Sequence, residues 1–262
     1  LYFLFQWYPK IWSFSGDLSV KYLGTKTEIY QSLVYLAIMV VIGKIQSLPF
    51  ELYSTFVIER KHGFNKQTVG LFISDTIKGF LLQAVLGGPF VAAFIWVVRR
   101  FGDNFYLAVW LLVFCFQMFV MLIFPTFIQP LFNKFESLPE GSLRTKIEAL
   151  ARKLTFPLSQ VFVMDGSKRS SHSNAYFFGF FTKRIVLFDT LIQQNSEDEI
   201  CAVLGHELGH WKCWHQFQML FVTQLHIFAL FYAFSHFINR AEIYSAFGFG
   251  QEMPVIIGLM LF

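Results

Sequence analysis

The sequence predicts a mainly α-helical, polytopic membrane protein with a small β-hairpin in its one long polar region. Of the 262 residues, 55% are hydrophobic and only 15% are charged, whereas soluble domains average about 25% charged residues. Several stretches are also long and apolar enough to cross a hydrocarbon core, which takes about 20 helical residues. The net charge of +4 is modest and no basic run stands out, which argues against nucleic acid as a partner.

Four stretches have the length and apolarity of a membrane-spanning helix: residues 29–48, 79–98, 105–124 and 217–238. Buried helices of a large soluble protein are the alternative. Polar side chains interrupt these stretches at Lys44, Gln83, Gln117 and His226. Because polar groups are costly inside a bilayer, they indicate either a water-lined interior or hydrogen bonds within the helix bundle.

These stretches divide the chain into three predicted regions. Residues 1–132 form an N-terminal membrane-spanning region, 133–216 the long polar region, and 217–262 a truncated C-terminal membrane-spanning region. Both ends of the chain lie inside apolar runs, so we expect it to be an excerpt of a longer protein.

Loop charges predict the orientation in the membrane. Basic residues follow the first span at Arg60, Lys61, Lys66 and Lys78, the second at Arg99 and Arg100, and the last at Arg240 alone. The first connection and the polar region share a side, and the positive-inside rule makes that side cytosolic.

The polar region begins with a predicted amphipathic helix over residues 140–154. Apolar residues recur there at helical spacing: Leu143, Ile147, Leu150 and Leu154. A short β-run follows at 161–164. Residues 175–181 and 184–188 then predict two strands of a hairpin that turns at Thr182 and Lys183.

A second helix is predicted to begin at Ser196, because Glu199 stands three residues later as in a capping box. It carries His-Glu-Leu-Gly-His at residues 206–210, which has the form H-E-x-x-H. Residues four apart lie on one helix face, so His206 and His210 can bind one zinc ion. Glu207 stands beside them, where it can accept a proton from metal-bound water.

Two residues just after this motif were candidates for the same site. Cys213 falls on almost the same helix face, but ligands on three successive turns span about 10 Å, too far for one zinc ion. We therefore expect a packed thiol there. His215 is expected to project about 180° away from His206 and to be structural or interfacial. Together with Cys115 and Cys201, Cys213 predicts buried free thiols instead of a disulfide framework.

A catalytic zinc ion needs three protein ligands and one open position. Downstream of His210 the only carboxylates are Glu242 and Glu252, and neither lies in a pattern typical of a ligand-bearing helix. The third ligand is therefore predicted to be missing from this chain.

Several blocks of sequence, taken together, resemble the type I CAAX prenyl proteases, which are zinc metalloproteases of the endoplasmic reticulum and inner nuclear membrane. The blocks are FVIERKHGFN at 56–65, GSKRSSHSNAYFFG at 166–179, KRIVLFDTL at 183–191 and AVLGHELGHW at 202–211. The resemblance implies a multi-span helical barrel of seven spans around a water-filled chamber that the zinc site faces. It implies a multi-pass protein of the endoplasmic reticulum membrane, in contact with lipid, with the catalytic region toward the cytosol.

The resemblance also implies an activity and the residues that perform it. Members are zinc metalloendopeptidases that remove the C-terminal three residues of prenylated C-a-a-X proteins and cut some substrates a second time upstream. On this pattern His206 and His210 are zinc ligands and Glu207 is the general base. His172, Asn174 and Ala175 would belong to an edge strand that pairs with extended substrate; an ordinary hairpin with Asn174 in a turn is the alternative. The family's third ligand, a glutamate in an E-x-x-x-D pattern, is absent here.

Two other functions stay open. An intramembrane protease would place the motif inside the bilayer, but charged residues on both sides of the motif, from Glu197 to Lys212, argue against that. A non-catalytic scaffold or pseudoprotease would only bind prenylated or translocating clients. The intact Glu207 argues against a scaffold, and the missing third ligand argues for it.

Overall fold

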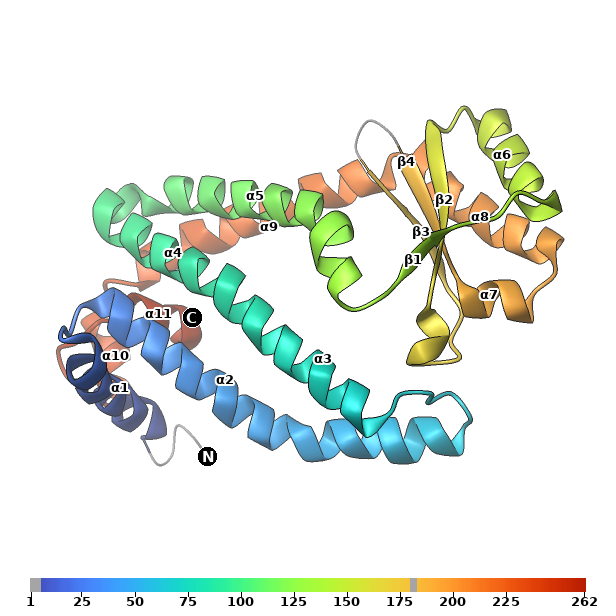
Figure 1. Cartoon of the computed structure of the whole chain (residues 1–262). Coiled ribbons are helices and arrows are strands. Elements are labelled where there is room, and N and C mark those ends of the chain that lie inside the picture. Colours follow the sequence, from blue (N-terminus) through green and yellow to red (C-terminus); the bar gives the residue numbers. More distant parts are fainter. Residues whose placement is uncertain (1–5, 180–182) are drawn as a thin grey trace. The chain divides into compact units, whose positions relative to one another are not determined.

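The computed structural model describes residues 6–179 and 183–262, which form two compact units (Figure 1). The helical unit comprises the described residues of Leu1–Phe50, Gly79–Gln117 and Thr223–Phe262. The sheet unit comprises those of Glu51–Lys78 and Met118–Val222. Both units combine segments from more than one of the regions 1–132, 133–216 and 217–262, and that division stays a prediction.

Long helices occupy the apolar part of the sequence. They are α1 (Trp7–Leu23), α2 (Glu28–Tyr53), α3 (Val69–Leu82), α4 (Gly88–Phe101), α5 (Phe105–Ile123) and α9 (His215–Phe237), followed by the short α10 (Ala241–Ala246) and α11 (Val255–Leu261). Single π-helical turns extend or join them at Ser54–Glu59, Gln83–Gly87 and Phe124–Ile128.

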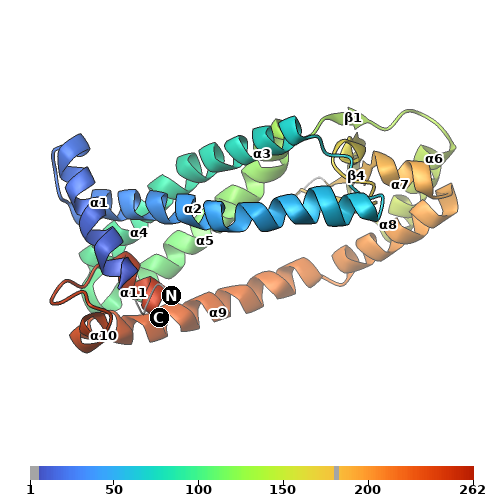
Figure 2. The ribbon, with the colours of Figure 1, turned by 90° about the horizontal axis from the view of Figure 1, so that it is seen from below.

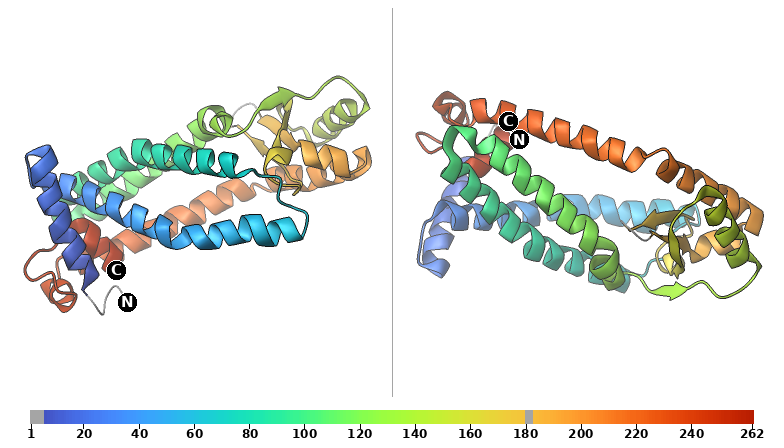
Figure 3. Two further views of the ribbon diagram at one scale, coloured as in Figure 1. Left: turned by 60° about the horizontal axis from the view of Figure 1, so that its bottom comes forward. Right: turned by 90° about the horizontal axis from the view of Figure 1, so that it is seen from above.

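In the described part of the chain, three helical runs are long and apolar enough to cross a membrane: Glu28–Glu59, Val69–Leu131 and His215–Phe237. The 63-residue middle run reverses direction at the turn Gly102–Asn104, where Gly102 has φ 56° and ψ −134° (Figures 1 and 3). It therefore supplies two spans. All four predicted stretches fall on these helical runs, and the chain is a helical membrane protein.

Within the helical unit, aromatic and aliphatic side chains pack between α4, α5 and α9. Phe94 contacts Phe231 of α9, and Phe105 contacts Phe234. The ring centroids are 5.8 Å apart in both pairs. A hydrogen bond crosses this apolar interior: the Gln224 side-chain amide donates to Gln117 Oε1 at 2.6 Å. For Gln117, hydrogen bonding inside the bundle is thus the interpretation that the structure favours.

The sheet unit contains four strands in the order β1-β2-β4-β3. They are β1 (Phe135–Ser137), β2 (Leu158–Met164), β3 (Ala175–Phe178) and β4 (Lys183–Phe188). β2 pairs with β4 in parallel, and the β1–β2 and β3–β4 pairs are antiparallel. The predicted β-run lies within β2, and the predicted hairpin is β3–β4.

One detail of the hairpin prediction was wrong. Lys183 is the first residue of β4 instead of a turn residue, because it pairs with Leu158 of β2. Its ammonium donates to the carbonyl of Gly179, and burial lowers its pKa. The rest of the predicted turn, with residues 180–182, lies outside the described residues.

Helices α6 (Ser142–Leu154), α7 (Asp189–Gln194) and α8 (Glu197–Lys212) complete the sheet unit. The predicted amphipathic helix is α6, and its buried residues Ile147 and Ala151 join one core with Ile185 and Leu187 of β4. α8 contributes Ile200, Leu204 and Leu208 to the same core. Because these three residues recur every four positions, one face of α8 is anchored along its whole length.

Candidate metal centre

The start of α8 is set by a capping box. The Ser196 hydroxyl accepts from the Glu199 backbone amide at 3.4 Å, and the Glu199 carboxylate accepts from the Ser196 backbone amide at 2.7 Å. The Ser196 backbone amide and hydroxyl both donate to the Glu199 carboxylate, and these two hydrogen bonds lower the pKa of that carboxyl group. The box predicted from the sequence is confirmed, and it fixes the register in which the following residues meet the core.

Because Ile200, Leu204 and Leu208 hold one face of α8 in the core, His206 and His210 project from a different part of its surface. His206 is exposed, while Glu207 and His210 are half-buried. A metal ion bound by these side chains would therefore be accessible at the surface of the sheet unit. The apolar packing of Ile200, Leu204 and Leu208 holds the helix that carries them.

The two histidine rings face each other through their Nε2 atoms. His206 Nε2 and His210 Nε2 lie 3.1 Å apart, and the rings are perpendicular with centroids 4.7 Å apart. Two imidazole nitrogens bound to one tetrahedral zinc ion at 2.0–2.1 Å are about 3.3 Å apart. The pair thus fits one metal ion. Within the described residues, no group of three His, Cys, Asp or Glu side chains is placed to hold a metal.

The expected packing of Cys213 and the expected direction of His215 were wrong. Both assumed that the helix continues, but α8 ends at Lys212, and Trp214 adopts φ 60° (Figure 2). The chain turns there, and His215 Nδ1 comes to 2.7 Å from His210 Nδ1 instead of projecting away. Cys213 caps the helix and is exposed instead of packed.

The other cysteines differ in their surroundings. Cys115 lies on α5 and is exposed, so the prediction of a buried thiol was wrong there too. Its neighbours on that helix are exposed apolar side chains such as Leu111, which is what a lipid-facing surface requires. Cys201 on α8 is half-buried, and this burial raises the pKa of its thiol. All three thiols are free, as predicted.

His172 lies before the hairpin, not in a strand. Its ring stacks on Phe64 with centroids 4.3 Å apart, and its Nε2 lies 3.2 Å from Glu59 Oε2. Its backbone carbonyl accepts from Thr190 Oγ1 at 3.0 Å. His172 is therefore held between the segment that follows α2 and the start of α7.

Asn174 and Ala175 stand at the start of the edge strand. The Asn174 side-chain carbonyl accepts from the Ala175 amide at 2.8 Å, and the Asn174 backbone carbonyl accepts from Phe188 N at 3.0 Å. Ala175 begins β3, and its side chain is buried in the core shared with α8. The other edge of β3 has no partner strand among the described residues.

An ion pair that the sequence analysis missed joins the block 166–179 to Asp75 of α3. Arg169 donates to both carboxylate oxygens of Asp75, at 2.8 and 2.9 Å, and to the Phe132 carbonyl at 2.7 Å. Nearby, Lys66 N donates to the Arg169 carbonyl at 3.0 Å. The connection between α2 and α3 thus contacts the polar region directly, which confirms that both lie on the same side. Asp75 and Arg169 are 94 positions apart in the sequence, so no local pattern predicts this pair.

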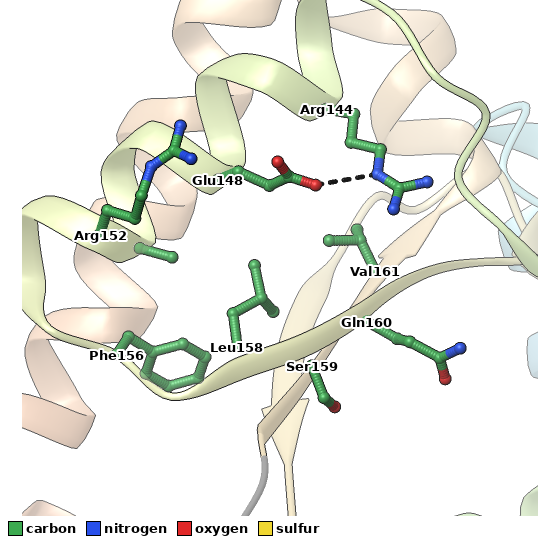
Figure 4. A pocket seen from close by; sticks show the side chains of 9 residues that line it. Arg144, Glu148, Arg152, Phe156, Leu158, Ser159, Gln160 and Val161 are labelled. Carbon is green, nitrogen blue, oxygen red and sulfur yellow. Dashed lines mark hydrogen bonds and ion pairs between the residues drawn. The ribbon is translucent and has the colours of Figure 1, made fainter.

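A separate cavity of about 210 Å³ lies between α6 and β2 (Figure 4). Arg144 and Glu148, which form an ion pair at 3.0 Å, and Arg152 line its polar side, and Phe156 and Leu158 line its apolar side. None of the predicted site residues lines it. The cavity holds no arrangement of a nucleophile with a base, and it is distinct from the histidine pair.

Comparisons with known proteins agree with this arrangement. Residues 1–134 match the family model described as CAAX prenyl protease N-terminal, five membrane helices, and residues 137–262 match Peptidase family M48. A CAAX prenyl protease 1 homolog of Oryza sativa subsp. japonica is 51% identical over 97% of this chain and 60% of its own length. The Homo sapiens homolog is 39% identical over 100% of this chain and 63% of its own length.

A solved structure, Ste24p of S. mikatae, superposes with a TM-score of 0.94 at 42% identity and covers 99% of this chain. The chain spans 64% of that protein and about 60% of the curated relatives above. Membership of a metallopeptidase family implies a bound metal, which agrees with the spacing of the His206–His210 pair. The chain belongs to the CAAX prenyl protease family, with its second half in peptidase family M48.

Proposed function

We propose that this chain is part of a zinc metalloendopeptidase that removes the C-terminal three residues of prenylated C-a-a-X proteins, with a second upstream cleavage in some substrates. The observation that carries the proposal is the 3.1 Å separation of His206 Nε2 and His210 Nε2, with Glu207 beside them on the same helix. Relatives named CAAX prenyl protease 1 match this helix and nearly all of the chain.

The residues of α8 divide the chemistry between them. His206 and His210 would hold zinc through their Nε2 atoms, and bound zinc would polarise the scissile carbonyl and acidify a water molecule. Glu207 would accept the proton of the attacking water and pass it to the leaving amine. The core contacts of Leu204 and Leu208 keep these three side chains in fixed register.

Substrate would pair with β3. An extended peptide can add to the open edge of a sheet through main-chain hydrogen bonds, and the outer edge of Ala175–Phe178 is free among the described residues. α8 packs against this strand, since Ala175 and Phe177 share the core of Leu204 and Leu208. Asn174 would set where the strand begins, and His172 would border its entry. This arrangement supports substrate-binding roles for His172, Asn174 and Ala175.

The third zinc ligand is proposed to be a glutamate outside these 262 residues. Two facts support this: the matched relatives are longer than this chain, and neither downstream carboxylate, Glu242 or Glu252, lies in an E-x-x-x-D pattern. One of them, Glu252, accepts a hydrogen bond from Trp12 Nε1 at 2.8 Å. An E-x-x-x-D helix encoded in the full-length gene would supply the missing ligand.

The proposed setting is the endoplasmic reticulum membrane, extending to the inner nuclear membrane, with the sheet unit toward the cytosol. The basic residues between α2 and α3 support this orientation. Lipid would surround the exposed apolar side chains of the membrane helices. A seven-span barrel around a water-filled chamber is proposed for the full-length protein from its family membership.

The test is hydrolysis of a farnesylated C-a-a-X peptide by the purified full-length protein, with and without a zinc chelator. We expect release of the C-terminal tripeptide that stops with the chelator and returns with added zinc. Absence of release from a protein that demonstrably binds zinc would contradict the proposal. That result would favour the alternative of a non-catalytic scaffold for prenylated or translocating clients.

A further inference from the structure

His215 lies against the ligand His210 because of the break between α8 and α9. α8 ends at Lys212, and the positive φ of Trp214 reverses the chain so that His215 begins α9. The His210 and His215 rings meet edge to face with centroids 5.0 Å apart, and their Nδ1 atoms are 2.7 Å apart. This is a hydrogen-bond distance, so one of the two nitrogens carries the shared hydrogen.

The direction of this hydrogen bond decides whether His210 can bind a metal. A neutral imidazole has one N–H donor and one acceptor nitrogen. If His215 donated, His210 would carry its hydrogen on Nε2, the atom that faces His206, and could not bind zinc there. If His210 donates from Nδ1, its Nε2 lone pair is free. The metal-binding form therefore requires His215 to be the acceptor.

We propose that His215 is a positioning residue that accepts the Nδ1–H of His210 and thereby fixes the tautomer and ring orientation of this ligand. The inference rests on the proposed zinc site. Partners that bond to the second ring nitrogen of a ligand histidine raise its basicity, and their loss typically weakens metal binding by about 10- to 100-fold.

The geometry argues against two simpler roles for His215. It cannot be a ligand to the same metal through this contact, because it meets His210 at Nδ1, whereas His206 faces Nε2. It does not fill a core either, because its side chain is exposed outside the three buried apolar clusters of the described chain. The remaining role for His215 is that of a hydrogen-bond acceptor, since its Nδ1 lies 2.7 Å from His210 Nδ1.

This assignment predicts different behaviour for two substitutions of similar shape. In His215→Asn, the side-chain carbonyl oxygen stands where Nδ1 stood and can accept the same hydrogen. In His215→Leu, a methyl group stands there and cannot. His226→Leu, farther along α9, is the matched control.

The experiment is competition for zinc between the full-length protein and a chromophoric chelator, which does not depend on peptidase activity. We expect His215→Leu to lower zinc affinity about 10- to 100-fold, and His215→Asn and His226→Leu to change it less than about threefold. In the cobalt-substituted protein, the visible absorption bands should shift in His215→Leu and not in His215→Asn.

Two results would overturn the proposal: unchanged affinity and spectrum in His215→Leu, or equal losses in the Leu and Asn variants. If His215→Leu fails to fold, His215→Gln replaces it, because its carbonyl lies one bond farther out and should not restore the contact. The proposed peptidase function is tested by a different measurement, tripeptide release. That release could be absent while the difference in zinc affinity between the variants persists.

Discussion

The helical unit and the sheet unit are stabilised by different surroundings. Helices of the helical unit expose large apolar side chains, such as Leu107, Leu111 and Leu225, the last with 60% of its surface exposed. The sheet unit encloses a core from α6, α8 and β4 in which Ile185 and Leu187 are fully buried. Lipid solvates the first kind of surface, whereas only packing removes the second from water. Replacing a leucine with alanine should therefore lower the free energy of unfolding by different amounts in the two units.

Activity should be the property most sensitive to change, and the proposed catalytic residues lie in the sheet unit. We expect Glu207→Gln in the full-length protein to lower turnover of a farnesylated peptide by about 100- to 10,000-fold, because the amide cannot accept a proton. Zinc content should be unchanged, since Glu207 is not one of the proposed ligands. Asp198→Asn, at the exposed start of the same helix, is the control and should keep its activity. Near-normal turnover of Glu207→Gln would remove the general-base role.

Stability should show the next largest effect. Leu204 is 1% exposed on α8, and Leu204→Ala should lower the free energy of unfolding by about 2–5 kcal/mol through lost burial and the cavity that remains. Val203→Ala, its more exposed neighbour on the same helix, should change it by about 0.5 kcal/mol or less. Leu225→Ala gives the matching measurement in the helical unit.

The readout is the denaturant midpoint of the full-length protein in lipid nanodiscs, followed by near-ultraviolet circular dichroism. If Leu225→Ala destabilised as much as Leu204→Ala, its exposed surface would be a protein contact instead of a lipid contact. The contrast between the units would then be wrong for α9.

The ion pair of the sheet unit should contribute less than its core. Arg169 and Asp75 keep 23% and 17% of their side-chain surfaces exposed, so solvent screens the pair in part. Arg169→Lys loses the bidentate contact with Asp75. We expect this to lower the free energy of unfolding by about 1–3 kcal/mol, because polar groups are left unsatisfied. Arg152→Lys, at the cavity beside α6, is the control. A double-variant cycle with Asp75→Asn measures the coupling, and a coupling near zero would show that the pair does not hold this part of α3 against the polar region.

Features that depend on a few neighbouring residues could be predicted from the sequence. The four spans follow from local apolarity, the start of α8 from Ser196 and Glu199, and the histidine pair from its spacing of four residues. Each depends on contacts within about one or two helical turns, so the rest of the fold cannot alter it much.

Features set by long-range contacts or by a single backbone angle were missed. His215 was misplaced because helical extrapolation cannot foresee the left-handed conformation of Trp214. Lys183 was assigned to a turn, because its pairing with β2 involves a strand 25 residues earlier in the chain, at Leu158. The contact of Arg169 with Asp75 crosses 94 residues and leaves no periodic signal. The order of the strands in the sheet, with β1 beside β2, was not predicted because it also depends on long-range contacts.

The smallest expected effect lies in the helical unit, at the hydrogen bond between Gln117 and Gln224. Side-chain hydrogen bonds between membrane helices average about 0.6 kcal/mol, because the unfolded helices find other partners in the membrane. Gln117→Leu should therefore destabilise by little more than that, and adding Gln224→Leu should recover part of the loss by removing the amide left without a partner. A four-variant cycle in nanodiscs measures the coupling. Zero coupling, together with reaction of a cysteine at position 117 with water-soluble thiol reagents, would instead favour a water-lined interior. The polar residues of the membrane helices would then serve hydration, and the helical unit would depend on water as well as on lipid.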